Sequence, residues 1–153
     1  GDSGKVQEVF DRLEELRGTD HKVLLFSEFT SFLDVIAEEM KQRGWTYDLL
    51  TGQSRDRESI VKHFQQTPSC QFFLVSLKAG GEGLNLTEAD YVFLLDPWWN
   101  HAAEEQAIAR AHRSGQRRSV MVYRFITRGS LEEQILKVQD RKDDLVKAII
   151  HNV

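Results

Sequence analysis

The 153-residue sequence has a single cysteine, Cys70, and only two prolines. One cysteine cannot form an internal disulfide, and no Cys/His cluster has zinc-site spacing, so the sequence predicts a reducing compartment and no bound metal. No apolar run approaches the roughly 20 residues that a membrane-spanning helix needs, and no signal-peptide pattern is present. The composition is that of a soluble globular protein, and the abrupt start GDSGK suggests a piece of a longer chain.

The motifs with which nucleotide-binding proteins hold phosphate and Mg²⁺ are also missing. There is no G-x-x-x-x-G-K-[ST] loop, the run AGGEGLN at residues 79–85 does not match G-x-G-x-x-G, and no Asp-Glu dipeptide occurs. By itself this chain is therefore expected neither to bind a cofactor nor to hydrolyse ATP. The missing glycine fingerprint also argues against a dinucleotide- or sugar-nucleotide-binding enzyme, one alternative class.

Acidic residues are absent between Glu105 and Glu132, although the formal net charge of the chain is −4. Six arginines fall in that interval: Arg110, Arg113, Arg117, Arg118, Arg124 and Arg128. Most charge runs are solvated faces. Six guanidinium groups without a nearby carboxylate favour a polyanionic partner instead.

Short apolar runs alternate with amphipathic stretches along the chain. The runs predict strands over residues 22–27, 46–50, 71–76, 91–95 and 119–126. Helical periodicity and end signals predict helices over residues 5–16, 31–43, 55–66, from 100 to near 115, and from 130 onward. This alternation predicts one α/β domain over residues 1–153: a doubly wound, mainly parallel sheet with helices on both faces and a long C-terminal helix.

Ligands of such sheets collect at the carboxyl ends of the strands. Hydroxyls, glycines, a lysine and two tryptophans follow the predicted strands there, in the segments 27–30, 51–54, 76–81 and 96–100. This composition suits a phosphate-backbone surface better than a small-molecule pocket.

Three blocks resemble a known family: KVLLFSEFTSFLDVI, LVSLKAGGEGLNLTEADYVFLLDPWWN and EEQAIARAHRSGQ. They are similar to the C-terminal RecA-like helicase lobe of Swi/Snf-family, superfamily-two, ATP-dependent DNA translocases, and we expect a bacterial member. Weaker likeness extends over nearly the whole chain. His101, Ser114 and Glu82 depart from the residues that the family usually has at their positions.

The resemblance assigns catalytic roles to one helical stripe, Gln106, Arg110 and Arg113. It implies that Arg110 and Arg113 are arginine fingers that reach the γ-phosphate held by another lobe, and that Gln106 positions them or the attacking water. The residues alone also allow a solvated arginine face.

The resemblance further implies that Gly83 and Asn85 face the nucleotide and that a set of rim residues contacts the DNA backbone. That set comprises Ser27, Thr30, Ser54, Arg55, Lys78, Gly80, Gly81, Trp99 and Asn100. Other interpretations stay open. Gly80 and Gly81 also suit a plain turn, and Thr30, Ser54 and Asn100 suit helix N-caps.

The implied function is the second motor lobe of a double-stranded DNA translocase or remodeller that tracks DNA independently of sequence. ATP and Mg²⁺ would be bound mainly by a first RecA-like lobe of the same protein. A bacterial protein would lie in the cytoplasm with the nucleoid, a eukaryotic one in the nucleus, and no membrane partner is expected. The second alternative is a non-catalytic DNA-binding or interaction module. Residues 130–153 would form a helix whose distal apolar set either braces the first lobe or wraps this one.

Overall fold

The computed structural model describes residues 2–76, 86, 88–96, 118–125 and 131–138. The helices in these ranges are α1 (Asp2–Leu16), α2 (Thr30–Arg43) and α3 (Arg57–Gln66). The strands are β1 (Val23–Ser27), β2 (Tyr47–Leu50), β3 (Phe72–Ser76), β4 (Tyr91–Leu94), β5 (Arg118–Phe125) and β6 (Leu131–Val138).

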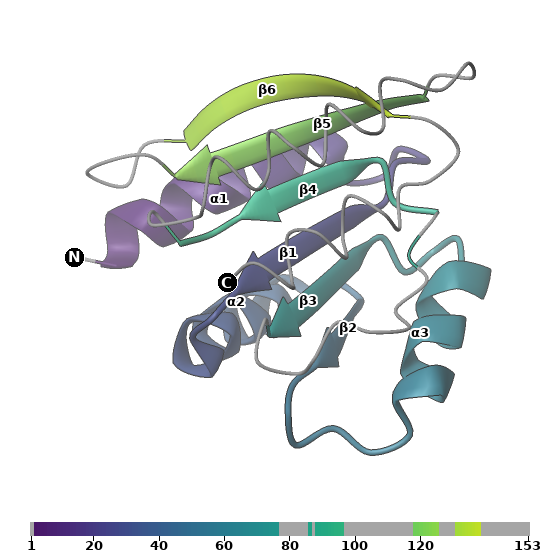
Figure 1. Ribbon diagram of the computed structural model, residues 1–153. Helices are drawn as coiled ribbons and strands as arrows, with labels where there is room; N and C mark the ends of the chain where they lie inside the picture. The colour runs from purple at the N-terminus through teal and green to yellow at the C-terminus, as the bar shows by residue number, and fades with distance from the viewer. Residues whose placement is uncertain (1, 77–85, 87, 97–117, 126–130, 139–153) are drawn as a thin grey trace.

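The strands form one sheet in the order β2-β3-β1-β4-β5-β6 (Figure 1). Strands β1 to β5 pair in parallel, and β6 pairs with β5 in the antiparallel sense. Every residue of β1 and β3 is buried, as expected for central parallel strands that are covered on both faces. The predicted mainly parallel α/β fold is confirmed, and so are its first five strands.

Helices lie on both faces of the sheet (Figure 1). Alternate strand residues such as Leu25, Leu74 and Phe93 join one core cluster with residues of α1 and α2. The intervening residue Phe73 points to the other face, where its ring lies 4.9 Å from that of Phe64 on α3. The helices on both faces are therefore confirmed as well.

Helix α2 shows how the sequence specifies a local boundary. Its buried residues are Leu33, Ile36, Ala37 and Met40, the spacing of one helical stripe. The helix ends where Gly44 adopts a left-handed conformation with φ of 75° and its N–H bonds the carbonyls of Lys41 and Met40. Glycine takes this conformation without the steric cost that a β-carbon imposes.

The start of α3 corrects one prediction. The helix begins at Arg57 rather than residue 55, and its N-cap is Asp56, whose carboxylate accepts a hydrogen bond from the N–H of Ser59 at 3.3 Å. Ser54 lies in the preceding loop and its hydroxyl accepts the N–H of Thr51 at 2.8 Å. Ser54 and Asp56 could both cap this helix, and Asp56, which directly precedes Arg57, does so.

The second correction concerns the expected C-terminal helix. Residues Leu131–Val138 form β6, with Leu131 opposite Phe125 and Val138 opposite Arg118 of β5. The pairing satisfies backbone groups on an edge of β5 that would otherwise be open. Pairing with the preceding strand β5 here overrides the local helix signal of the capping box that Ser130 and Glu133 could form. Residues 139–153, the rest of the predicted helix, and the predicted helix over residues 100–115 lie outside the described residues.

A pair of glycine substitutions tests the end of α2. A β-carbon at Gly44 or at Gly4 of α1 would meet nothing within 4 Å, so neither substitution creates a clash. Because only Gly44 of the two has positive φ, Gly44→Ala should lower the free energy of unfolding by about 1–2 kcal/mol. Gly4→Ala should raise it by up to about 1 kcal/mol. Urea denaturation measures both, and equal effects of the two substitutions would contradict this account.

Candidate nucleic-acid interface

The carboxyl ends of β1 to β4 meet at one edge of the sheet, toward which their arrowheads point in Figure 1. Strand β1 occupies the centre, with β3 on one side and β4 on the other. Register places Ser27 beside Ser76, the last residues of β1 and β3. We call this border the carboxyl edge.

A buried carboxylate holds the centre of the carboxyl edge. Asp96, two residues beyond the end of β4, accepts the Ser27 hydroxyl at 2.8 Å and the N–H of Glu28 at 2.6 Å. The Ser27 hydroxyl in turn accepts the N–H of Phe29 at 3.0 Å. Asp96 therefore ties the turn between β1 and α2 to the point at which the chain leaves β4.

Burial changes the acidity of this group. Asp96 is 2% exposed, and this desolvation raises the pKa of its carboxyl above the ordinary 3.8, while the hydrogen bonds from Glu28 and Ser27 oppose the shift. Burying a carboxylate is costly unless its oxygens are hydrogen-bonded. Two donors at its two oxygens supply that compensation.

Ser27 and Thr30, the two candidates at the end of β1, lie in different environments. The Ser27 side chain is fully buried among the described residues, and its hydroxyl is engaged by Asp96 and the Phe29 N–H, so Ser27 supports the turn. Thr30, by contrast, is exposed and is the first residue of α2. The N-cap is Phe29 and makes no side-chain cap hydrogen bond, so the alternative that Thr30 caps α2 is wrong.

The loop between β2 and α3 presents the second pair of candidates. The Ser54 N–H bonds the Thr51 carbonyl at 3.1 Å, and the Gln53 N–H bonds the Thr51 hydroxyl at 3.2 Å. With the bond from the Thr51 N–H to the Ser54 hydroxyl, these contacts close a compact turn. Arg55 follows this turn, exposed, on the carboxyl-edge side of β2.

The remaining candidates fall outside the described residues. They are Lys78, Gly80, Gly81, Gly83, Asn85, Trp99, Asn100, Gln106, Arg110 and Arg113. The described strands still fix where their segments begin, because residue 77 follows the end of β3 and residue 97 follows Asp96. Both segments therefore start at the carboxyl edge, beside Ser27.

The contact between Asp96 and Ser27 was not predicted from the sequence. The two residues are 69 positions apart and carry no motif of their own. The available signal was a polar residue at the end of each of two apolar runs, Ser27 after residues 22–26 and Asp96 after residues 91–95. The carboxyl ends of neighbouring parallel strands lie close together. A cluster of Asp48, His63 and Cys70 was also missed, because sequence spacing does not show it.

Replacement of Asp96 tests the buried contact. Asp96→Asn keeps the shape of the side chain but replaces one acceptor oxygen with an amide N–H₂. That group faces a donor, either the Ser27 hydroxyl or the Glu28 N–H, so the substitution should lower the free energy of unfolding by about 1–3 kcal/mol. A raised pKa means that the folded state holds the proton more tightly than the unfolded state. The wild-type carboxyl therefore contributes stability that is fully present below pH 3.8 and is lost as the pH rises through the raised pKa.

The difference between wild type and Asp96→Asn should accordingly be larger at acidic pH and shrink toward neutrality. Urea denaturation across that range measures it. The exposed Asp34→Asn on α2 is the control and should change stability by no more than about 0.5 kcal/mol. A difference that does not vary with pH would show that the Asp96 carboxyl does not titrate as its burial requires.

Among the described residues, no helix is long and apolar enough to span a bilayer.

Comparison with known proteins identifies the family. Residues 4–115 match the family described as "Helicase conserved C-terminal domain". DNA repair protein RAD5B of Arabidopsis thaliana is 45% identical over 149 residues, which are 95% of this chain and 12% of that protein. The chromatin-remodeling ATPase INO80 of Aspergillus oryzae is 42% identical over 151 residues, 97% of this chain and 10% of that protein.

Solved structures of SWI2/SNF2 ATPases have a similar fold. The Sulfolobus solfataricus SWI2/SNF2 ATPase core in complex with dsDNA shares 33% identity at a TM-score of 0.64, over 80% of this chain and 26% of that one. This chain thus spans about a tenth of the two curated relatives. Both come from eukaryotes, so the expectation of a bacterial member gains no support from them. The chain belongs to the helicase conserved C-terminal domain family and is a C-terminal, RecA-like lobe of the Swi2/Snf2 ATPase type.

Proposed function

We propose that this chain is the second motor lobe of an ATP-driven translocase or remodeller of double-stranded DNA. The observation that supports the proposal is that Thr30 and Arg55 are exposed beyond the carboxyl ends of β1 and β2, at the edge where the chain also leaves β3 and β4 toward Lys78 and Trp99. The likeness to an ATPase core that was solved with double-stranded DNA supports it.

The proposed DNA surface combines several chemistries. Arg55 offers a guanidinium that can donate two hydrogen bonds to one phosphate, and Thr30 offers an exposed hydroxyl. The half-buried Ser54 closes the turn that carries Arg55. Lys78, Gly80, Gly81, Trp99 and Asn100 complete the proposed contact set. Ser27 acts indirectly, through the turn that it holds with Asp96.

Contacts of this kind address the sugar-phosphate backbone and carry no base information. Binding should therefore be nearly independent of sequence and sensitive to salt, because each neutralised phosphate releases counterions. A motor that moves along any duplex requires both properties.

The catalytic part of the proposal rests on residues 106–113. Arg110 and Arg113 would stabilise charge on the transferring phosphoryl group, with Gln106 as the positioning side chain and Gly83 and Asn85 facing the nucleotide. ATP and Mg²⁺ would be held mainly by a first lobe, since this chain has no phosphate-binding loop and no Asp-Glu dipeptide. When bound, the ion would neutralise charge on the phosphates.

The place of action follows from the partner. The protein would work wherever cellular DNA lies, and the eukaryotic origin of the curated relatives favours a nucleus over a bacterial nucleoid. The distal apolar set at residues 145–150 remains a proposed brace against the first lobe.

A non-catalytic DNA-binding or interaction module on the same fold is the alternative. It shares the carboxyl edge but needs neither Arg110 nor Arg113. A first lobe with a phosphate-binding loop in the same protein separates the two, because only a motor requires one.

Two exposed arginines at opposite edges of the sheet test the DNA surface. Arg55 follows β2 at the carboxyl edge, whereas Arg17 follows α1 near the start of β1. Arg55→Ala should weaken binding to unrelated duplexes equally and flatten the slope of log affinity against log salt by about one unit. Lys78→Ala should do the same, and Trp99→Ala should weaken binding with little change of slope.

Arg17→Ala removes the same charge from the opposite edge and should leave affinity and slope nearly unchanged. Fluorescence anisotropy with two duplexes of unrelated sequence, over a series of salt concentrations, measures both quantities. Equal effects of Arg55→Ala and Arg17→Ala, or a change of sequence preference, would refute this surface.

A further inference from the structure

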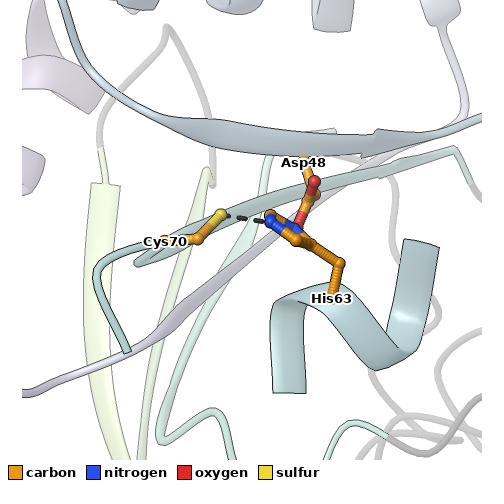
Figure 2. A group of neighbouring side chains, drawn as sticks. All are labelled: Asp48, His63 and Cys70. Atoms are coloured by element: carbon orange, nitrogen blue, oxygen red, sulfur yellow. Dashed lines mark hydrogen bonds and ion pairs between the residues drawn. The ribbon is translucent and has the colours of Figure 1, made fainter. Parts of the chain in front are cut away.

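Three potential metal ligands meet on the opposite side of the fold from the carboxyl edge. Asp48 lies on the outer strand β2, His63 on α3, and Cys70 just before β3, and Figure 2 shows their side chains turned toward one another. One ligand atom from each lies within 4.8 Å of the others. Asp48 is the second residue of β2, and Cys70 precedes β3, so the group lies toward the amino ends of these strands.

Hydrogen bonds to one carboxylate oxygen, Asp48 Oδ2, hold this group together. Cys70 Sγ lies 3.4 Å from Asp48 Oδ2, and His63 Nδ1 lies 2.7 Å from the same oxygen. Metal–ligand bonds of about 2.0–2.3 Å in tetrahedral zinc sites imply about 3.4 Å between ligand atoms. The sulfur and oxygen already have that separation. His63 Nδ1 must move away from Asp48 Oδ2 to reach that separation, and its half-exposed side chain leaves room for this.

We propose that Asp48, His63 and Cys70 form a binding site for Zn²⁺ or a similar divalent transition metal, with a fourth position open to water. Thiolate, imidazole and carboxylate are the ligand types that Zn²⁺ takes. The His63 side chain is 51% exposed, so solvent reaches the group from that side. The three ligands come from three elements, and a bound ion therefore connects β2, α3 and the start of β3.

Binding requires a specific exchange of protons. Burial, with the neighbouring Asp48 carboxylate, raises the pKa of the Cys70 thiol to about 12, so the thiol keeps its proton until a metal competes for the sulfur. The S–H bond then breaks, its proton passes to solvent, and a bond between sulfur and metal forms. The hydrogen bond between His63 Nδ1 and Asp48 Oδ2 breaks as well. The proton on Nδ1 passes to solvent, and the neutral ring keeps its proton on Nε2 so that Nδ1 can bind the metal.

One cation faces this group. The Lys22 ammonium donates to the carbonyl oxygens of Phe64, Thr67 and Cys70. Its charge favours the thiolate of Cys70 and is held on backbone oxygens, not on the three ligand atoms. Glu88 adds a negative charge near Lys22. The site thus pairs two anionic ligands and one neutral ligand with a dication.

Cobalt provides a direct test, because Cys70 is the sole sulfhydryl of the chain. Titration of the folded 153-residue chain with Co²⁺ should produce a thiolate-to-cobalt charge-transfer band in the near ultraviolet, and Zn²⁺ should displace it. Loss of a supporting hydrogen bond costs about 10–100-fold in metal affinity, so His63→Ala and Cys70→Ser, which remove ligands, should each cost at least about 100-fold. Circular dichroism checks that each variant is folded.

The chain offers a matched control in a second histidine–aspartate pair, His21 and Asp90, whose Nδ1 and Oδ2 are 2.6 Å apart. Among the described residues, no third histidine, cysteine or carboxylate joins this pair in a possible metal site. His21→Ala should therefore leave the cobalt spectrum and affinity unchanged. No charge-transfer band in the folded chain would overturn the proposal, and so would a band that persists in His63→Ala. Since His63 is exposed, that variant decides the matter even if Cys70→Ser does not fold.

Discussion

The buried carboxylate of Asp96 is the contact on which the carboxyl edge depends. Its two oxygens take the Ser27 hydroxyl and the Glu28 N–H, and thereby join the end of the central strand to the exit of its neighbour. An unpaired carboxylate in this place would cost several kcal/mol, so the turn is stable only in the position that supplies both donors. The entry of α2 and the start of the segment beyond Asp96 are set by the same bonds. Positions at the proposed DNA surface thus depend on a contact beneath it.

At the opposite end of the strands, where they begin, two other buried polar side chains, Gln71 and Lys22, hold the loops. Gln71 donates to the carbonyls of Leu16, Thr19 and His21 and accepts the N–H of Gly18. Lys22, the residue after His21, donates to three carbonyls near the end of α3. These two side chains satisfy backbone groups that the loops would otherwise bury unpaired. These hydrogen bonds therefore fix the loops at the amino ends of the strands. The proposed metal site lies next to these loops.

Patterns within ten to fifteen residues predicted most of this fold. The apolar runs predicted the first five strands to within one or two residues, and Gly44 marked the end of α2. The failures have physical causes. Both Ser54 and Asp56 could cap α3, and only Asp56 does. Strand β6 forms where a capping box favoured a helix, because hydrogen bonding to β5 outweighs that local signal.

The candidate site, too, could be predicted from the sequence only in part. Resemblance to the family named rim residues, and the exposed Thr30 and Arg55 agree with a surface role. Ser27 differs because burial and its bond to Asp96 are properties of the folded chain and not of a motif. The cluster of Asp48, His63 and Cys70 has no recognisable spacing, since three separate elements bring it together.

The central claim is that this lobe completes an ATPase site whose phosphate-binding parts lie in another lobe. DNA-stimulated ATP turnover tests it most directly, measured for the 153-residue chain alone, for the protein that contains both lobes, and for that protein with Arg113→Ala. The account predicts no turnover for the chain alone, turnover for the two-lobed protein, and a loss of roughly a thousandfold in the variant. Turnover by the isolated chain that Arg113→Ala abolishes would contradict it.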